Sequence, residues 1–135
     1  MLSKQTLFAT QQTVVFSHSR VTKRKDGIVE VLLGDDVCYE ICDLKEINKA
    51  SGELCSYKKH PFLFLAGQFT SISNEARTWG ATEEATQLSK AEAYVLKSLA
   101  QKIIANFYLS FNKPPVPTKF FSSKMEAEKW LTGFN

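Results

Sequence analysis

Residues 60–77 read His-Pro-Phe-Leu-Phe-Leu-Ala-Gly-Gln-Phe-Thr-Ser-Ile-Ser-Asn-Glu-Ala-Arg. The run from Phe62 to Ala66 is apolar without interruption, and a polar turn and a helix start at Ser73 follow it. A strand that is apolar on both faces is typical of the centre of a parallel sheet. The residues after such a strand lie at the carboxyl end of the sheet, where open α/β folds place their sites. This stretch therefore predicts an α/β fold and indicates where a site would lie.

The chain before this stretch opens with strands. Residues 13–17 and 19–24 look extended, and the dipeptide Asp26-Gly27 is a strong hairpin signal because both residues tolerate a positive φ. The β-rich segment 28–33 follows it. An antiparallel pair is therefore expected before the first helix.

Helices are expected between the later strands. Apolar residues at helical spacing predict a helix over 37–50, closed by Ser51-Gly52, and Ser71 or Ser73 can cap the next helix. A further helical segment is expected over residues 82–88.

Residues 89–98 fit either a helix or a strand. Ser89 and Glu92 match a capping box, which favours a helix, whereas the alternation of residues 91–96 fits a strand. A second capping box, Ser98 with Gln101, predicts that a helix begins there, so we assign a strand to about 91–96.

The last part of the chain has the clearest helix. Leu99, Ile103, Phe107 and Phe111 form one apolar stripe of a helix over 99–111. A strand over 116–121 and a terminal helix follow. The order β-β-α-β-α-β-α-β-α predicts a single α/β domain over residues 1–135, with a mixed, mostly parallel five-stranded sheet and four or five helices. If successive strands are also neighbours, right-handed crossovers would put every helix on one face and leave the other for a partner or a ligand.

Composition narrows the class of protein. Of 135 residues, 44% are hydrophobic and 23% are charged, which is ordinary for a soluble globular protein. The net charge of +3 and basic clusters without interleaved aromatics argue against nucleic-acid binding. No run approaches the ~20 apolar residues of a membrane span, and no export signal is seen. The odd count of three cysteines then indicates reduced thiols in a cytoplasm.

Three segments resemble the STAS superfamily, typified by the SpoIIAA-like anti-sigma-factor antagonists. They are residues 71–77, 105–114 and 117–123, and the likeness covers about residues 20–132. The chain looks still more similar to a group of small uncharacterised bacterial proteins with a STAS-like domain. The resemblance implies a SpoIIAA/STAS-like fold and a regulatory or ligand-binding domain without catalysis.

In the antagonists, a serine at the start of the helix after the central strand is phosphorylated, within a motif that reads roughly Ile-Asp-Ser-Ser-Gly-Leu. Laid on Ile72 to Arg77, this motif puts the phosphorylated serine on Glu75, the serine before it on Asn74 and the aspartate on Ser73. The switching serine is therefore absent. The residues expected to form an interaction surface are Ser71, Ser73, Asn74, Glu75, Arg77, Asn112 and Lys113.

Catalytic, metal and cofactor chemistry is not indicated by the sequence. The three cysteines and His60 match no standard zinc spacing, and buried structural thiols are the expected state of Cys38, Cys42 and Cys55. Neither His18 nor His60 can be placed in a Ser-His-Asp or Cys-His arrangement. Gly67 is a single glycine and is not part of a glycine-rich phosphate-binding motif. We expect no catalytic residue, no metal and no cofactor.

Two hypotheses of function follow. The first is a cytoplasmic STAS-like regulatory domain that binds a protein partner or a second copy of itself. The second is a carrier or sensor that holds a small apolar or anionic molecule between the sheet and the helices. A large apolar pocket would favour the second hypothesis, and a flat exposed surface over residues 71–77 the first.

Overall fold

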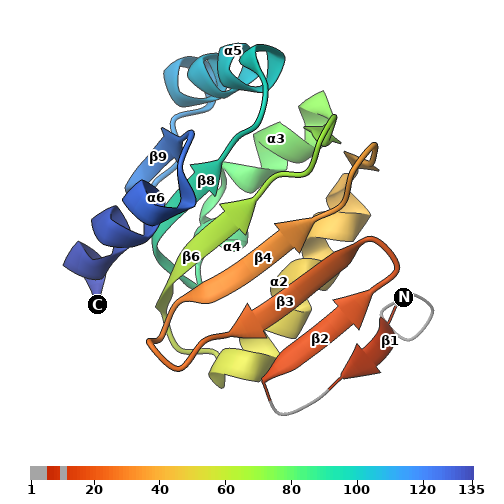
Figure 1. Ribbon diagram of the computed structural model, residues 1–135, viewed down its shortest axis with the longest axis vertical. Coiled ribbons are helices and arrows are strands. Elements are labelled where there is room, and N and C mark those ends of the chain that lie inside the picture. Colours follow the sequence, from red (N-terminus) through yellow and green to blue (C-terminus); the bar gives the residue numbers. More distant parts are fainter. Residues whose placement is uncertain (1–5, 10–11) are drawn as a thin grey trace.

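Seven strands form the central sheet of the computed structural model, which describes residues 6–9 and 12–135 (Figure 1). The strands, in sheet order, are β1 (Thr6–Ala9), β2 (Thr13–Phe16), β3 (Ser19–Lys23), β4 (Val29–Leu33), β6 (His60–Leu65), β8 (Ser89–Val95) and β9 (Thr118–Phe121). The pairs from β1 to β4 are antiparallel, and those from β4 to β9 are parallel. Only β1 and β3 thus run against the other strands, which confirms the mixed, mostly parallel α/β class. The sheet is wider than the five strands expected, because β2 pairs with β3 and β1 adds a further strand.

The central strand is β6, which lies between β4 and β8. Phe62 is 2% exposed on one face and Leu63 is fully buried on the other. The unbroken apolar run in the sequence therefore reflects burial on both faces, as predicted.

Five α-helices accompany the sheet, in agreement with the expected four or five. They are α2 (Ile41–Cys55), α3 (Asn74–Gly80), α4 (Glu83–Thr86), α5 (Leu99–Phe107) and α6 (Lys124–Leu131). A π turn, η1 (Tyr108–Asn112), continues α5, and a 3₁₀ turn, η2 (Thr132–Phe134), ends the chain. None of these described helices is long and apolar enough to cross a bilayer.

The first helix differs from its expected limits of 37–50. The two residues of β5 (Cys38–Tyr39) pair instead with β7 (Ser71–Ile72), and Glu40 forms a capping box with Asp43. Ser51 lies inside the helix, where its hydroxyl donates to the Ile47 carbonyl at 2.8 Å. Gly52 does not end the helix either: a Cβ there would lie 2.4 Å from the Tyr57 ring, so the glycine makes room for that ring.

The ambiguous segment 89–98 contains strand β8, as assigned. Ser98 and Gln101 form the capping box of α5. Ser89 and Glu92, the competing capping-box pair, are joined by a side-chain hydrogen bond of 2.7 Å within β8. A register shift against β6, where Ser89 pairs with His60 and Ala91 with Pro61, accompanies this contact.

Helices cover both faces of the sheet, which corrects the expectation that every helix would lie on one face. Figure 1 shows α2 and α3 behind the sheet, α6 in front of it, and α5 beyond its carboxyl edge. Helix α6 follows the last strand and joins no parallel pair, so the crossover rule does not restrict it. Ala127 and Leu131 of α6 are fully buried against Leu63 and Ala93.

An ion-pair cluster ties α6 to the first hairpin. The Arg24 guanidinium lies 2.6 Å from the Glu128 carboxylate, 2.7 Å from Asp26 and 3.2 Å from Glu30. The expected turn at Asp26-Gly27 is present, with Gly27 at φ 91°. Arg24 thus links the β3–β4 turn to the helix that covers the second face of the sheet.

Candidate functional site

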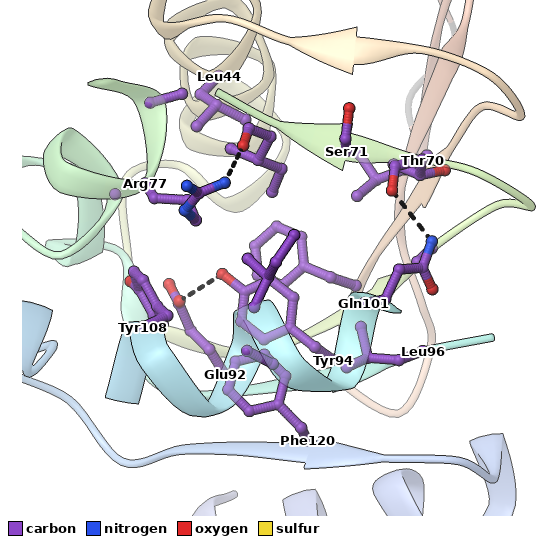
Figure 2. A pocket seen from close by; sticks show the side chains of 18 of the residues that line it. Leu44, Thr70, Ser71, Arg77, Glu92, Tyr94, Leu96, Gln101, Tyr108 and Phe120 are labelled. Atoms are coloured by element: carbon purple, nitrogen blue, oxygen red, sulfur yellow. Dashed lines mark hydrogen bonds between the residues drawn. The ribbon is translucent and has the colours of Figure 1, made fainter. Parts of the chain in front are cut away.

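A cavity of about 150 Å³ lies between the sheet and the helices near the carboxyl ends of β6 and β8. Its lining comes from β4, β6, β7, β8 and β9, from α2, α3, α4 and α5, from the π turn η1, and from the loop after β6. The lining is largely apolar and the cavity is partly open to solvent. Figure 2 shows side chains from opposite sides pointing into this space. The location is the one that the stretch after the central strand predicts.

Aromatic rings on three adjacent strands form one wall of the cavity. Phe64, Tyr94 and Phe120 are register partners across β6, β8 and β9. The ring centroids of Phe64 and Tyr94 are 4.5 Å apart, and those of Tyr94 and Phe120 are 5.2 Å apart. Tyr108, from the π turn, meets the Phe120 ring edge-on at 6.4 Å. These rings offer a flat apolar surface to a small ligand.

Among the described residues, Glu92 is the one acid that lines the cavity, and it is 4% exposed. Burial raises the pKa of its carboxyl group from 4.5 to about 7, although hydrogen bonds from Ser89 and Tyr94 act in the opposite direction. The Ser89 hydroxyl donates at 2.7 Å and the Tyr94 hydroxyl at 3.1 Å. Figure 2 shows the carboxyl group beside the Tyr108 ring. Glu92 is thus a buried acid that changes its protonation near neutral pH.

In the part of the chain that the structure describes, Arg77 is the one cation that lines the cavity. It comes from α3, is half-buried, and donates a hydrogen bond to the Ile72 carbonyl. Among the described residues, no acid forms an ion pair with it. Figure 2 shows its guanidinium group on the side of the cavity opposite Glu92. A guanidinium group with unused N–H donors is a natural partner for a carboxylate.

Gln101 connects α5 to the loop after β6. Its amide nitrogen donates to the carbonyls of Gly67 at 3.1 Å and Thr70 at 3.0 Å, and its amide oxygen accepts from the backbone N–H of Ser98. The Thr70 hydroxyl in turn accepts from the Gly67 N–H at 2.7 Å and donates to the Gly34 carbonyl at 2.6 Å. These bonds hold the first turn of α5 against the edge of the cavity.

Only some of the residues predicted to form an interaction surface near the start of α3 lie at the cavity. Ser71 and Arg77 both line the cavity. Ser73 is the N-cap of α3 and accepts from the Ala76 N–H at 3.1 Å, while Asn74 and Glu75 are exposed and line no part of the cavity. The last two candidates, Asn112 and Lys113, lie at the end of the π turn and also outside the cavity.

Several cavity residues were not singled out as site residues from the sequence: Phe64, Glu92, Tyr94, Gln101, Tyr108 and Phe120. Trp79 lines the cavity together with Tyr94 and Tyr108. Glu92 did carry a usable signal, because a carboxylate in the middle of a strand assigned to a parallel sheet must face a packed layer. The partners Ser89 and Tyr94 could be found only from the three-dimensional structure.

The cysteines and histidines lie apart from the cavity. Cys38 and Cys42 are exposed, which corrects the expectation that all three thiols are buried, and only Cys55 is enclosed. Cys38 belongs to β5, so it does not share a helix with Cys42. In the described part of the chain no three residues among His, Cys, Asp and Glu are grouped as metal ligands would be.

The fold and the cavity define an α/β domain with a largely apolar, partly open pocket at the carboxyl end of its sheet. Residues 22–135 match the family described as "Domain of unknown function (DUF7793)", and the chain belongs to this family. A crystal structure of a protein with unknown function from Arthrobacter sp. FB24 is similar at 28% identity, covering 83% of this chain and 97% of that one, with a TM-score of 0.33. None of the curated proteins compared with the chain matches it. Neither match names the STAS superfamily, so that resemblance stays a prediction.

Proposed function

We propose that this domain binds a small, largely apolar carboxylate in the cavity, as a carrier or sensor without catalysis. The observation that carries the proposal is the cavity itself, which an aromatic wall and the cation Arg77 both line. Its volume of about 150 Å³ suits one small ring, because a cavity of that size lined by apolar side chains binds benzene.

The chemistry of the lining supports a ligand with one anionic end. The ring or chain of the ligand would lie against Phe64 and Tyr94, and its carboxylate would pair with the guanidinium group of Arg77. Over residues 6–9 and 12–135, no histidine or cysteine lines the cavity, which supports binding rather than chemistry through a thiol or an imidazole.

Protonation of Glu92 would regulate this binding. Below about pH 7 the buried carboxyl group is neutral and does not repel a ligand carboxylate. Above that pH the ionised group lies in the same low-dielectric cavity and weakens anion binding. Affinity for a carboxylate therefore falls as the pH rises through about 7.

Phenylacetate and its uncharged analogue phenylacetamide test the proposal. We expect the chemical shifts of labelled protein to change around the cavity with phenylacetate, and the acid to bind more tightly than the amide. Arg77→Gln should remove that preference. Ile104→Trp places a large ring at a residue that lines the cavity and should block binding, whereas Ile103→Trp, on the neighbouring exposed position, should not.

Failure of both probes to shift cavity residues would contradict the proposal. Equal affinity for acid and amide would contradict the role given to Arg77. Unchanged binding by Ile104→Trp would place the ligand outside the cavity.

A regulatory role through a protein partner is a second candidate, in line with the STAS resemblance. The exposure of Ser71, Asn74 and Glu75 beside the cavity favours it, because a partner could reach this edge. Capture of a partner from the native cell, followed by Glu75→Lys, tests it: the variant should lose the partner, and unchanged capture would exclude this surface.

A further inference from the structure

Helix α5 and its π turn carry most of the large apolar side chains that are exposed in the described part of the chain. Of the nine large apolar residues that are exposed in the described chain, five belong to α5 and its π turn. Four of them form what we call the α5 stripe: Leu99 is 73% exposed, Ile103 50%, Phe107 59% and Phe111 74%. The sequence pattern predicts this stripe as a buried face, but the structure leaves it open.

The stripe is held outward by contacts on the opposite side of the helix. Ala105 and Tyr108 are buried, and Gln101 is bonded to the loop after β6. The stripe residues recur every four positions, and the π turn keeps Phe111 in line with Phe107, since their rings stack with centroids 5.5 Å apart. The helix therefore cannot turn its apolar stripe inward without breaking the contacts that close the cavity.

Positive charge is concentrated around the same helix. Residues 93–125 contain five lysines and no Asp or Glu, whereas the rest of the chain has 12 basic and 14 acidic residues. Lys97, Lys102 and Lys113, on α5 and its two ends, are all exposed. An exposed apolar stripe flanked by lysines is the pattern of helices that lie in the plane of a membrane interface.

We infer that the α5 stripe docks the domain on an anionic lipid surface, with the helix parallel to the membrane plane. The stripe would enter the headgroup boundary while the three lysines pair with anionic headgroups. A second copy of the chain is the less suitable occupant, because pairing two α5 helices would bring their lysines together without opposing acids. This surface goes beyond the proposed ligand cavity and does not depend on it.

Co-sedimentation with vesicles tests the inference. The protein should bind vesicles of phosphatidylcholine with phosphatidylserine and bind those of phosphatidylcholine alone much more weakly. Replacing Lys97 and Lys102 with Gln should weaken binding about fivefold per lysine. Phe107→Ser should weaken it on the order of tenfold, since the ring no longer enters the interface.

The control is Tyr57→Asn, which removes an aromatic side chain that is 65% exposed in the loop before β6. Circular dichroism verifies that each variant is folded, and the control should bind anionic vesicles like the parent. No binding to anionic vesicles, or equal binding of parent and Phe107→Ser, would overturn the inference. A dimer in analytical ultracentrifugation that Phe107→Ser dissociates would also overturn it and assign the stripe to a second copy.

Discussion

Replacing Glu92 with glutamine should stabilise the folded protein relative to the parent as the pH rises. Glu92 is 4% exposed, and its pKa of about 7 in the folded protein stands well above the 4.5 of a free carboxyl group. The folded state therefore holds its proton over a range where the unfolded state has lost it. The contribution of Glu92 to the free energy of unfolding is fully present below about pH 4.5. It declines between pH 4.5 and 7 and is lost above pH 7.

The size of the effect follows from the same shift. A difference of 2.5 pKa units corresponds to about 3 kcal/mol at 1.36 kcal/mol per unit. Glutamine cannot ionise, and its amide can replace the hydrogen bonds with the hydroxyls of Ser89 and Tyr94. The free energy of unfolding of Glu92→Gln minus that of the parent should therefore increase by roughly 2 to 3 kcal/mol between pH 5 and pH 8.

Urea unfolding of both proteins at pH 5 and pH 8 measures this difference, and the comparison cancels the titration of every other group. Glu75→Gln is the matched control, because Glu75 is exposed and its substitution should leave the difference constant within about 0.5 kcal/mol. The same stability gap between Glu92→Gln and the parent at both pH values would refute the assignment of a buried, protonated acid.

Two further pairs of variants test the fold by thermal and urea unfolding. Leu131→Ala should cost about 2–5 kcal/mol because Leu131, on α6, is fully buried against the sheet, whereas Leu99→Ala, at a 73% exposed position of α5, should cost under about 0.5 kcal/mol. Equal costs would contradict the placement of the two helices. Gly67→Ala should destabilise by about 1–3 kcal/mol, because its Cβ would lie 2.8 Å from the Asp35 backbone nitrogen, while Gly133→Ala has open space and should be neutral. A neutral Gly67→Ala would show that the loop at the cavity edge is not tightly held.

The sequence predicts much of the architecture because its strongest signals are local. The apolar run 62–66, the Asp26-Gly27 turn and the Ser98 capping box each act through neighbouring residues, and all three appear in the structure. The cavity lies at the carboxyl end of the sheet, where parallel sheets favour a site, and Arg77 lines it.

What could not be predicted depends on contacts between distant segments. The two-residue strands β5 and β7 have no periodicity to detect, and their pairing moves the start of α2 from 37 to 41. The stripe of α5 has the pattern of a buried face, but only the three-dimensional structure shows that Ala105 and Tyr108, and not the stripe, face the cavity. An apolar face of a helix is stabilised by contact with another apolar surface. That surface need not belong to the same chain.

The most direct test of the central claim is a crystal structure of the protein with 4-bromophenylacetate, in which anomalous scattering locates the bromine atom. The account predicts a bromine site inside the cavity, near the rings of Phe64 and Tyr94, with the ligand carboxylate on the Arg77 guanidinium group. Bromine sites confined to the outer surface, with the cavity free of ligand, would contradict it.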